Sequence, residues 1–247
     1  MRPILVTLAA ALLASSNAPA QSEKSSETKL DKTAVEAIVK DYILQHPEVL
    51  IESVRLHEQR ERAAAAERGK KAVVTHEEEL LRDKATPWAG AQEPETTVVQ
   101  FFDYRCGYCK RVLPMISSAA KKPGVRIVYK EFPILGPESM LAARLALAAD
   151  KQGKYREVHE SLMSSTAAIK AETVDEIAKK HGLEVGKLKK DMESAEVSEA
   201  LAKNQALASS LGVGSTPTFV IGSSLIPGAM EPAQFNALIE QSRKKKP

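Results

Sequence analysis

A predicted buried strand that runs into a cysteine pair is the feature that most constrains this sequence. The run TTVVQFF at 96–102 is β-branched and aromatic, as buried strands are, and the segment KRVLPMISSAAKK after the pair has helical composition. Cys106 and Cys109 lie between them and are the only two cysteines in 247 residues. A strand that passes through Cys-x-x-Cys into a helix puts the first thiol at a helix N-terminus, which favours the thiolate. We therefore expect a reactive cysteine pair.

The spacing also assigns a role to each thiol. Cys109 follows Cys106 by one helical turn and can attack a mixed disulfide formed at Cys106, which releases the bound partner. Between them, Gly107 lets the loop pass close to a substrate and Tyr108 offers an apolar contact. We expect Cys106 to be the nucleophile and Cys109 the resolving thiol.

Other uses of two cysteines are less well supported. A structural disulfide closing so short a loop would constrain the unfolded chain little, because that stabilisation grows with loop length. Zinc sites normally have four ligands, and the sequence has no second cysteine pair and no close pair of histidines. A Cu(I) ion held by Cys106 and Cys109 stays open, since this soft metal needs few ligands. No other cofactor is expected.

The order of elements around the pair predicts an α/β unit with a helical insertion. A second strand at 125–129 would complete a right-handed crossover of strand, helix and parallel strand. Residues 138–211 are helical in composition throughout. Short strands at 218–221 and 225–226 and a last helix, EPAQFNALIEQSRKK, complete the unit, which we expect to span 86–247.

An amphipathic helical segment at 33–85 precedes that unit. Its apolar stripe is broken at His46-Pro47, where proline fits the first turn of a new helix. The stripe consists of Val35, Ile38, Val39, Tyr42 and Ile43 before the break, and of Leu50, Val54 and His57 after it. Such helices owe their stability to packing, so the stripe docks either on the same chain or on another copy. We favour a dimer or trimer formed through 33–57, with the charged stretch 58–84 as a solvated helix or semi-rigid linker and Gly69 as its weak point.

The first twenty residues have the pattern of a secretory signal peptide. Arg2 supplies the positive charge, Ile4 to Ala14 the apolar core, and Ala18-Pro19-Ala20 the small-residue cleavage site. A membrane anchor is less well supported, because the apolar run falls short of the roughly 18 to 20 residues that span a bilayer. The polar stretch at 21–32 is expected to be a disordered leader. A net charge of +3 lacks the basic excess of nucleic-acid-binding proteins.

Together with GVGSTPTFV at 212–220, these motifs resemble a known family. The succession of strand, CGYC, helix, helical insertion and Thr-Pro before a hairpin is similar to the DsbA-like branch of the thioredoxin superfamily, over roughly 87–245. In that family the proline is cis and faces the cysteines. The resemblance therefore implies a thioredoxin fold in which Thr216 and Pro217 form part of the peptide-binding surface, with Gly107 and Tyr108 nearby.

Further details resemble one group within that family. The extension DYILQHPEVLIESV is similar to that of the ScsC proteins, suppressors of copper sensitivity, and of Com1-like oxidoreductases, some of which oligomerise through it. Gly-Tyr between the cysteines and Thr before the proline are similar to disulfide isomerases of the DsbC type, whereas DsbA-type oxidases commonly have Pro-His and Val.

The resemblance implies a periplasmic disulfide isomerase. Its partners would be misfolded or mis-oxidised exported proteins and a membrane reductase of the DsbD or ScsB kind. A dithiol oxidase that introduces disulfides, and a Cu(I)-binding or chaperone-like protein in copper tolerance, are the alternatives.

One position departs from the family pattern. Gln100 stands six residues before Cys106, where many relatives have a buried glutamate thought to relay protons. An amide can hydrogen-bond but cannot take a proton at neutral pH. Lys130 could pair with a carboxylate in the active site, or Lys130 and Glu131 could be ordinary polar residues at a strand end. Both interpretations stay open at this point.

Overall fold

The computed structural model describes residues 31–244. The expected signal peptide and nearly all of the expected leader lie outside these residues. The chain divides into two units, one ending at Leu56 and the other starting at His57. Within 31–244, no helix is both long and apolar enough to cross a membrane.

The N-terminal unit contains α1 (Lys32–Gln45) and the beginning of α2 (Pro47–Thr75). The predicted break is present, since His46 has non-helical dihedral angles and Pro47 opens the next helix. Helix α1 has no buried residue, and much of the predicted stripe is exposed. The exposed large apolar residues of this unit are Val35, Ile38, Val39, Tyr42, Leu44, Val49, Leu50, Ile51, Val54 and Leu56.

The second unit is built on a five-stranded sheet in the order β1-β3-β2-β4-β5. Its strands are β1 (Trp88–Gly90), β2 (Thr96–Phe102), β3 (Val125–Glu131), β4 (Thr218–Ile221) and β5 (Ser224–Pro227). Helix α4 (Gly107–Ala119) connects β2 to β3, which are parallel, while the other neighbours are antiparallel. The expected crossover is therefore confirmed. Strand β1 was not predicted, because its three residues show only turn signals.

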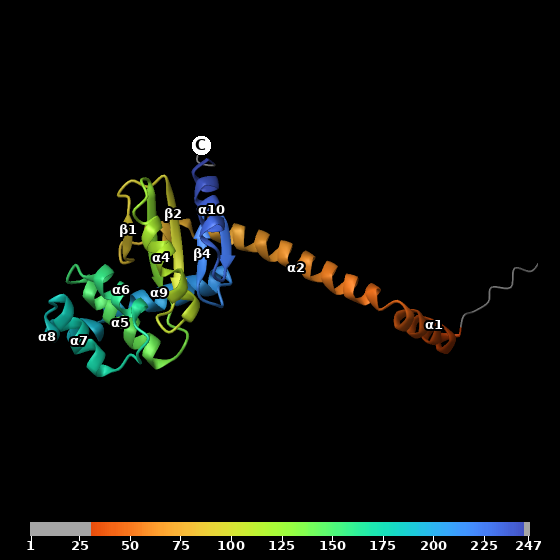
Figure 1. Ribbon diagram of the computed structural model, residues 1–247, viewed down its shortest axis with the longest axis horizontal. Coiled ribbons are helices and arrows are strands. Elements are labelled where there is room, and N and C mark those ends of the chain that lie inside the picture. Colours follow the sequence, from red (N-terminus) through yellow and green to blue (C-terminus); the bar gives the residue numbers. More distant parts are fainter. Residues whose placement is uncertain (1–30, 245–247) are drawn as a thin grey trace, which may run out of the picture. The chain divides into compact units, whose positions relative to one another are not determined.

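The predicted helical insertion is present within one residue of its expected bounds. It consists of α5 (Pro137–Asp150), α6 (Tyr155–Ser164), α7 (Ala171–His181), α8 (Val185–Met192) and α9 (Ala195–Leu211). Helices α5 to α8 gather beside one end of the sheet (Figure 1). Gly182 and Gly212 end α7 and α9 with φ values of 64° and 71°, a left-handed conformation that glycine adopts without steric cost.

The two faces of the sheet bury different side chains. Val98 and Phe102 belong to the core beneath α4 and α10 (Pro232–Lys244), which also extends into the insertion. Val99 and Phe101 point the other way, into a core shared with α9 and α3 (Glu77–Leu81). This alternation follows from the two-residue period of a strand.

The stretch expected to be a solvated linker differs from that prediction at its C-terminal end. Val73 and Leu80 are 5% and 1% exposed and belong to the core under the sheet. Helix α2 continues through Gly69, where an added Cβ would lie 3.3 Å from Leu225. The sequence here is mostly charged, so its few apolar residues did not predict a buried helix. The surface that covers them belongs to the sheet.

Candidate active site

Cys106 is the N-cap of helix α4. Its backbone is extended, with φ −76° and ψ 112°, and its Sγ accepts a hydrogen bond from the backbone N–H of Cys109 at 3.4 Å. Its own N–H donates to the carbonyl of Asp103 at 3.1 Å. Donors at a helix N-terminus stabilise negative charge on the capping atom. The structure thus puts the Cys106 sulfur at the N-terminal end of α4, facing a backbone N–H of that helix.

The second thiol lies deeper. Both cysteines are free, but Cys106 is 6% exposed and Cys109 only 1%. Burial raises the pKa of Cys109 well above its usual value, although the backbone of Asp103 and the hydroxyl of Thr216 oppose this. A thiol held protonated and covered is poorly suited to first attack. It is better suited to resolving a bond already formed at Cys106.

The Thr216-Pro217 loop lies against the cysteine loop at one end of the sheet. The peptide bond between these residues is cis. The Cys106 thiol donates to the carbonyl oxygen of Thr216 at 3.2 Å, although the two residues are 110 positions apart. Strand β4 starts directly after this loop and pairs with β2, which ends before the cysteines. The antiparallel register of β2 and β4 therefore brings both loops to the same end of the sheet.

A groove of about 560 Å³ lies beside this contact. Its lining includes Tyr108, Arg111, Met115, Thr216, Pro217 and Met230. The Tyr108 side chain is 56% exposed, and the Arg111 guanidinium lies 4.8 Å from the centre of its ring. A Cβ added at Gly107 would meet no atom within 4 Å. The groove is mainly apolar and includes Thr216, whose carbonyl contacts the Cys106 thiol, so it suits an extended polypeptide.

Asp103 is a site residue that was not singled out from the sequence. It is 1% exposed, and its carboxylate accepts four hydrogen bonds of 2.7 to 3.0 Å. The donors are the backbone N–H groups of Arg105, Ile134 and Leu135 and the hydroxyl of Ser139. Asp103 thus fastens the cysteine loop to the loop after β3. An acidic residue at the end of a buried strand, three residues before Cys106, was the available signal.

Gln100 and Lys130 do not meet. Gln100 is buried between Val98 and Phe102 in β2, and its partner in register on β3 is Tyr129. Lys130 lies one residue further along and faces the opposite core. Its Nζ donates to the hydroxyl of Thr86 at 2.7 Å and to the carboxylate of Asp83 at 3.3 Å.

The environment of Lys130 is therefore separate from the cysteines. Burial lowers the pKa of Lys130, although the Asp83 carboxylate opposes this. The lysine balances a carboxylate from the segment before β1, and the structure gives it no carboxylate partner at the cysteine loop. The register of β2 and β3 decides this, because adjacent strand residues point to opposite faces.

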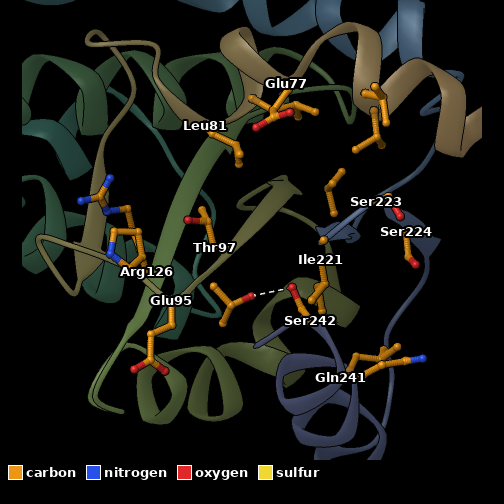
Figure 2. Close-up of a pocket in the computed structure, with 18 of the residues that line it drawn as sticks. Glu77, Leu81, Glu95, Thr97, Arg126, Ile221, Ser223, Ser224, Gln241 and Ser242 are labelled. Carbon is orange, nitrogen blue, oxygen red and sulfur yellow. Dashed lines mark hydrogen bonds between the residues drawn. The ribbon is translucent and has the colours of Figure 1, made fainter. Parts of the chain in front are cut away.

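A larger cavity of about 690 Å³ lies at the other end of the sheet (Figure 2). Thr97 at the start of β2 and Ile221 at the end of β4 line it, whereas the cysteines follow the opposite end of β2. The hydroxyl of Thr96 donates to that of Ser242 at 2.8 Å along its wall. This cavity has the larger volume, but it is far from the thiols. We therefore take the smaller groove beside Thr216 as the candidate site. Residues 31–244 contain no group of three or more His, Cys, Asp or Glu side chains placed to hold a metal.

Comparison with protein families agrees with this geometry. The family model described as "DSBA-like thioredoxin domain" matches residues 97–240, more than half of the chain. The chain belongs to the DSBA-like thioredoxin family. A second model, "Copper resistance protein ScsC N-terminal domain", matches residues 31–64. The thioredoxin fold with its helical insertion and the resemblance to ScsC are both confirmed.

Solved structures of the DSBA-like family extend the comparison. A thioredoxin-like oxidoreductase from Silicibacter pomeroyi DSS-3 is 40% identical, with a TM-score of 0.66 over 68% of this chain and 98% of that one. A linker-deletion mutant of Proteus mirabilis ScsC is 26% identical, with a TM-score of 0.67 over 90% of this chain and 100% of that one. Members of this family are thiol-disulfide oxidoreductases, and we assign this chain to that class.

The curated relatives match a smaller share of this chain than the solved structures do. A "Probable disulfide bond formation protein D" of Bacillus anthracis is 28% identical over 55% of this chain and 69% of its own length. The Na(+)/H(+) antiporter NhaA of Herminiimonas arsenicoxydans is 26% identical over 63% of this chain. The chain spans only about a quarter of that antiporter's length, so the match says nothing about ion transport by this chain.

Proposed function

We propose that this chain is an exported, periplasmic thiol-disulfide oxidoreductase that acts as a protein disulfide isomerase. One observation carries the proposal. The Cys106 thiol caps a helix and contacts the Thr216 carbonyl, while Cys109 is covered one turn behind it. A polypeptide lying in the adjoining groove would bring its disulfide directly to Cys106.

The reaction starts when the Cys106 thiolate attacks one sulfur of a substrate disulfide. A bond forms between Cys106 and that sulfur, the substrate S–S bond breaks, and the other substrate sulfur leaves as a thiolate. That thiolate, or another in the substrate, can attack elsewhere and finally expel Cys106. The substrate then has a rearranged pairing and no electrons have been consumed.

A stalled intermediate is released by the second thiol. Cys109 attacks Cys106, the mixed disulfide breaks, and the substrate leaves reduced while the Cys106–Cys109 pair becomes oxidised. Two electrons from a dithiol of a membrane reductase of the DsbD or ScsB type restore both thiols. Exported proteins with wrong disulfides are the proposed substrates.

Self-association through residues 33–57 belongs to the same proposal. The match to the ScsC N-terminal domain and the exposed apolar residues of α1 and early α2 support it. A dimer or trimer would hold several cysteine pairs around one substrate. This arrangement favours rearrangement and hinders re-oxidation of the pair by a membrane oxidase.

Reactivation of scrambled ribonuclease tests the isomerase. The protein with its pair reduced should restore ribonuclease activity, and Cys106→Ser should abolish that effect because no thiolate can start the exchange. Cys109→Ser, which keeps the nucleophile, serves as the matched variant and should retain part of the isomerisation. An equal rate for wild type and Cys106→Ser would overturn the proposal.

The same protein, oxidised, should be tested on reduced ribonuclease. The Bacillus relative is named for disulfide bond formation, and an oxidase would introduce disulfides rapidly while reactivating scrambled ribonuclease poorly. That pattern would replace isomerisation by oxidation and keep Cys106 as the reactive atom.

Copper binding is a second candidate, favoured by the match to a copper resistance domain. Two soft thiolates fit Cu(I), although burial holds Cys109 protonated, so that binding must release its proton. Titration with Cu(I) under a competing chelator should show one site that is lost in Cys106→Ser/Cys109→Ser. Undiminished binding in that variant would exclude a site at the pair.

A further inference from the structure

Glu131, the last residue of β3, lies in a buried polar cluster beside the cysteine loop. It is 1% exposed. Its Oε1 accepts two hydrogen bonds of 2.8 Å, from the phenols of Tyr104 and Tyr155. Its Oε2 is also buried and has no hydrogen-bond partner among the described residues. Half of this carboxyl group is therefore unsatisfied, which is costly for an ionised side chain.

His159 completes the cluster. Its Nδ1 lies 3.0 Å from the Tyr104 oxygen. The phenol has one proton and donates it to Glu131, so His159 must donate its Nδ1–H to Tyr104. Burial lowers the pKa of His159 to about 3, which keeps the ring neutral. The cluster thus connects β3, helix α6 and the loop before Cys106.

A second carboxyl group makes Glu131 the protonated member of a pair. Asp103, next to Tyr104, accepts four hydrogen bonds spread over both oxygens, which is what an ionised carboxylate requires. Glu131 accepts two on a single oxygen. When neighbouring acids have such different surroundings, the poorly solvated one holds the proton. Burial raises the pKa of Glu131 to about 8, against the two phenols, and the charge of Asp103 adds to the rise.

The cysteine loop connects this pair of carboxyl groups to the thiols. Tyr104 is two residues before Cys106, and the Asp103 carbonyl holds the Cys106 N–H at 3.1 Å. The Asp103 backbone also lowers the pKa of Cys109, against the larger effect of burial. We therefore expect a charge on Glu131 to act on the cysteine loop through a dry interior, where screening is weak. Gln100 cannot carry such a charge.

We propose that Glu131 is a positioning residue of the thiol chemistry, whose protonation, through Tyr104 and the Asp103 loop, sets the balance between the reduced and oxidised forms of the cysteine pair. The inference rests on Cys106 as the reactive thiol proposed above. A thiolate on Cys106 exists only in the reduced form, so ionised Glu131 repels that form and favours the disulfide. By linkage, reduction must in turn favour the protonated form of Glu131.

The groups that face Glu131 come from the cysteine loop, from β3 and from α6. They are Asp103 and Tyr104 on the loop, Tyr129 on the same strand, and Tyr155 and His159 on α6. Burial raises the pKa of Tyr129 to about 12 and those of Tyr104 and Tyr155 well above 10. A step near pH 8 in the redox equilibrium is therefore assigned to Glu131.

The test is the equilibrium of the full chain with glutathione between about pH 6.5 and pH 9.5, for wild type and Glu131→Gln. The amide keeps the oxygen that accepts from both phenols but cannot ionise. Above pH 8 the wild type should shift towards its disulfide, relative to the variant, by roughly two- to tenfold, as expected of one buried charge at an effective dielectric constant of about 20. Glu157→Gln removes an exposed carboxyl from α6 and should follow the wild type.

A second measurement keeps the inference testable if Glu131→Gln does not fold. In ¹³C-labelled wild type, the carboxyl signal that titrates near pH 8 should have a higher midpoint in the reduced than in the oxidised protein. Equal midpoints, or parallel glutathione curves for wild type and Glu131→Gln, would overturn the inference. Neither result affects the proposed function, which the two ribonuclease assays test separately.

Discussion

The N-terminal helices and the cysteine loop invert the usual burial pattern in opposite ways. In α1 and early α2, apolar side chains such as Ile38, Ile51 and Val54 are more than half exposed. Beside the cysteines, Asp103 and Glu131 are almost completely buried. Exposed apolar patches and buried polar groups both cost free energy in an isolated chain. Their presence in one small protein agrees with the two proposed functional regions, a surface for association and a site for thiol chemistry.

The two regions differ in how far neighbouring groups offset this free-energy cost. Asp103 has hydrogen-bond donors for both of its oxygens, whereas Glu131 has them for one. The apolar residues of α1 have no cover within the described part of the chain, since that helix contains no buried residue. The polar site is thus complete apart from one oxygen. The proposed association surface would be covered only by a partner.

The largest expected effect comes from the exposed stripe. Ile38→Asp combined with Val54→Asp should convert a self-associated protein to monomer, because each apolar side chain contributes about 1.5 to 3 kcal/mol when buried. Unfolding of the sheet unit should not change. Light scattering would give the mass, and isomerase activity should fall with it.

Lys40→Asp alters an exposed polar position of the same helix and should leave the mass unchanged. A monomeric wild type, or an oligomer that persists in the double variant, would remove self-association from the proposal.

Removal of the Asp103 carboxylate should have the next largest effect. Asp103→Ala leaves four donors, one of them buried and three partly buried, without an acceptor, and we expect a loss of about 3 kcal/mol in the free energy of unfolding. Urea denaturation of the reduced protein would measure it. Asp175→Ala is the matched change, because the Asp175–Lys189 ion pair is half exposed and should be worth less than about 1 kcal/mol. Equal losses in the two variants would contradict the role given to Asp103.

The smallest effect is a pH dependence that separates Glu131 from His159. The pKa of Glu131 rises from 4.5 to about 8 on folding, so its contribution to stability is full below pH 4.5 and is lost as pH rises through 8. The pKa of His159 falls from 6.5 to about 3, so its contribution is full above pH 6.5 and is lost as pH falls through 3. Between pH 4.5 and 6.5 the two effects oppose each other.

The window from pH 6.5 to pH 8 therefore isolates Glu131. There the wild type should lose up to about 2 kcal/mol of unfolding free energy, at about 1.4 kcal/mol per pH unit. Glu131→Gln should lose correspondingly less over the same window. Urea titrations at several pH values would show this, and identical slopes would mean that Glu131 is ionised throughout.

Local pattern was sufficient for much of the architecture. A β-branched run, a Cys-x-x-Cys and a helical segment predicted β2, α4 and the place of Cys106 at the N-terminal end of that helix. The break at His46-Pro47 and the bounds of the helical insertion also followed from composition and proline chemistry. These features depend on neighbours within a few residues, and a sequence displays those directly.

Only the tertiary structure decided the polar chemistry around the thiols. Three of the four donors to Asp103 come from residues more than 30 positions away, and Glu131 meets a phenol 24 positions further along. The pairing of β2 with β3 placed Tyr129, and not Lys130, beside Gln100. The sequence by itself determined which backbone conformations form and which atoms can react. Register and burial determined which polar groups share a dry interior, because a strand shows its two faces alternately and a carboxyl group changes character only when water is removed.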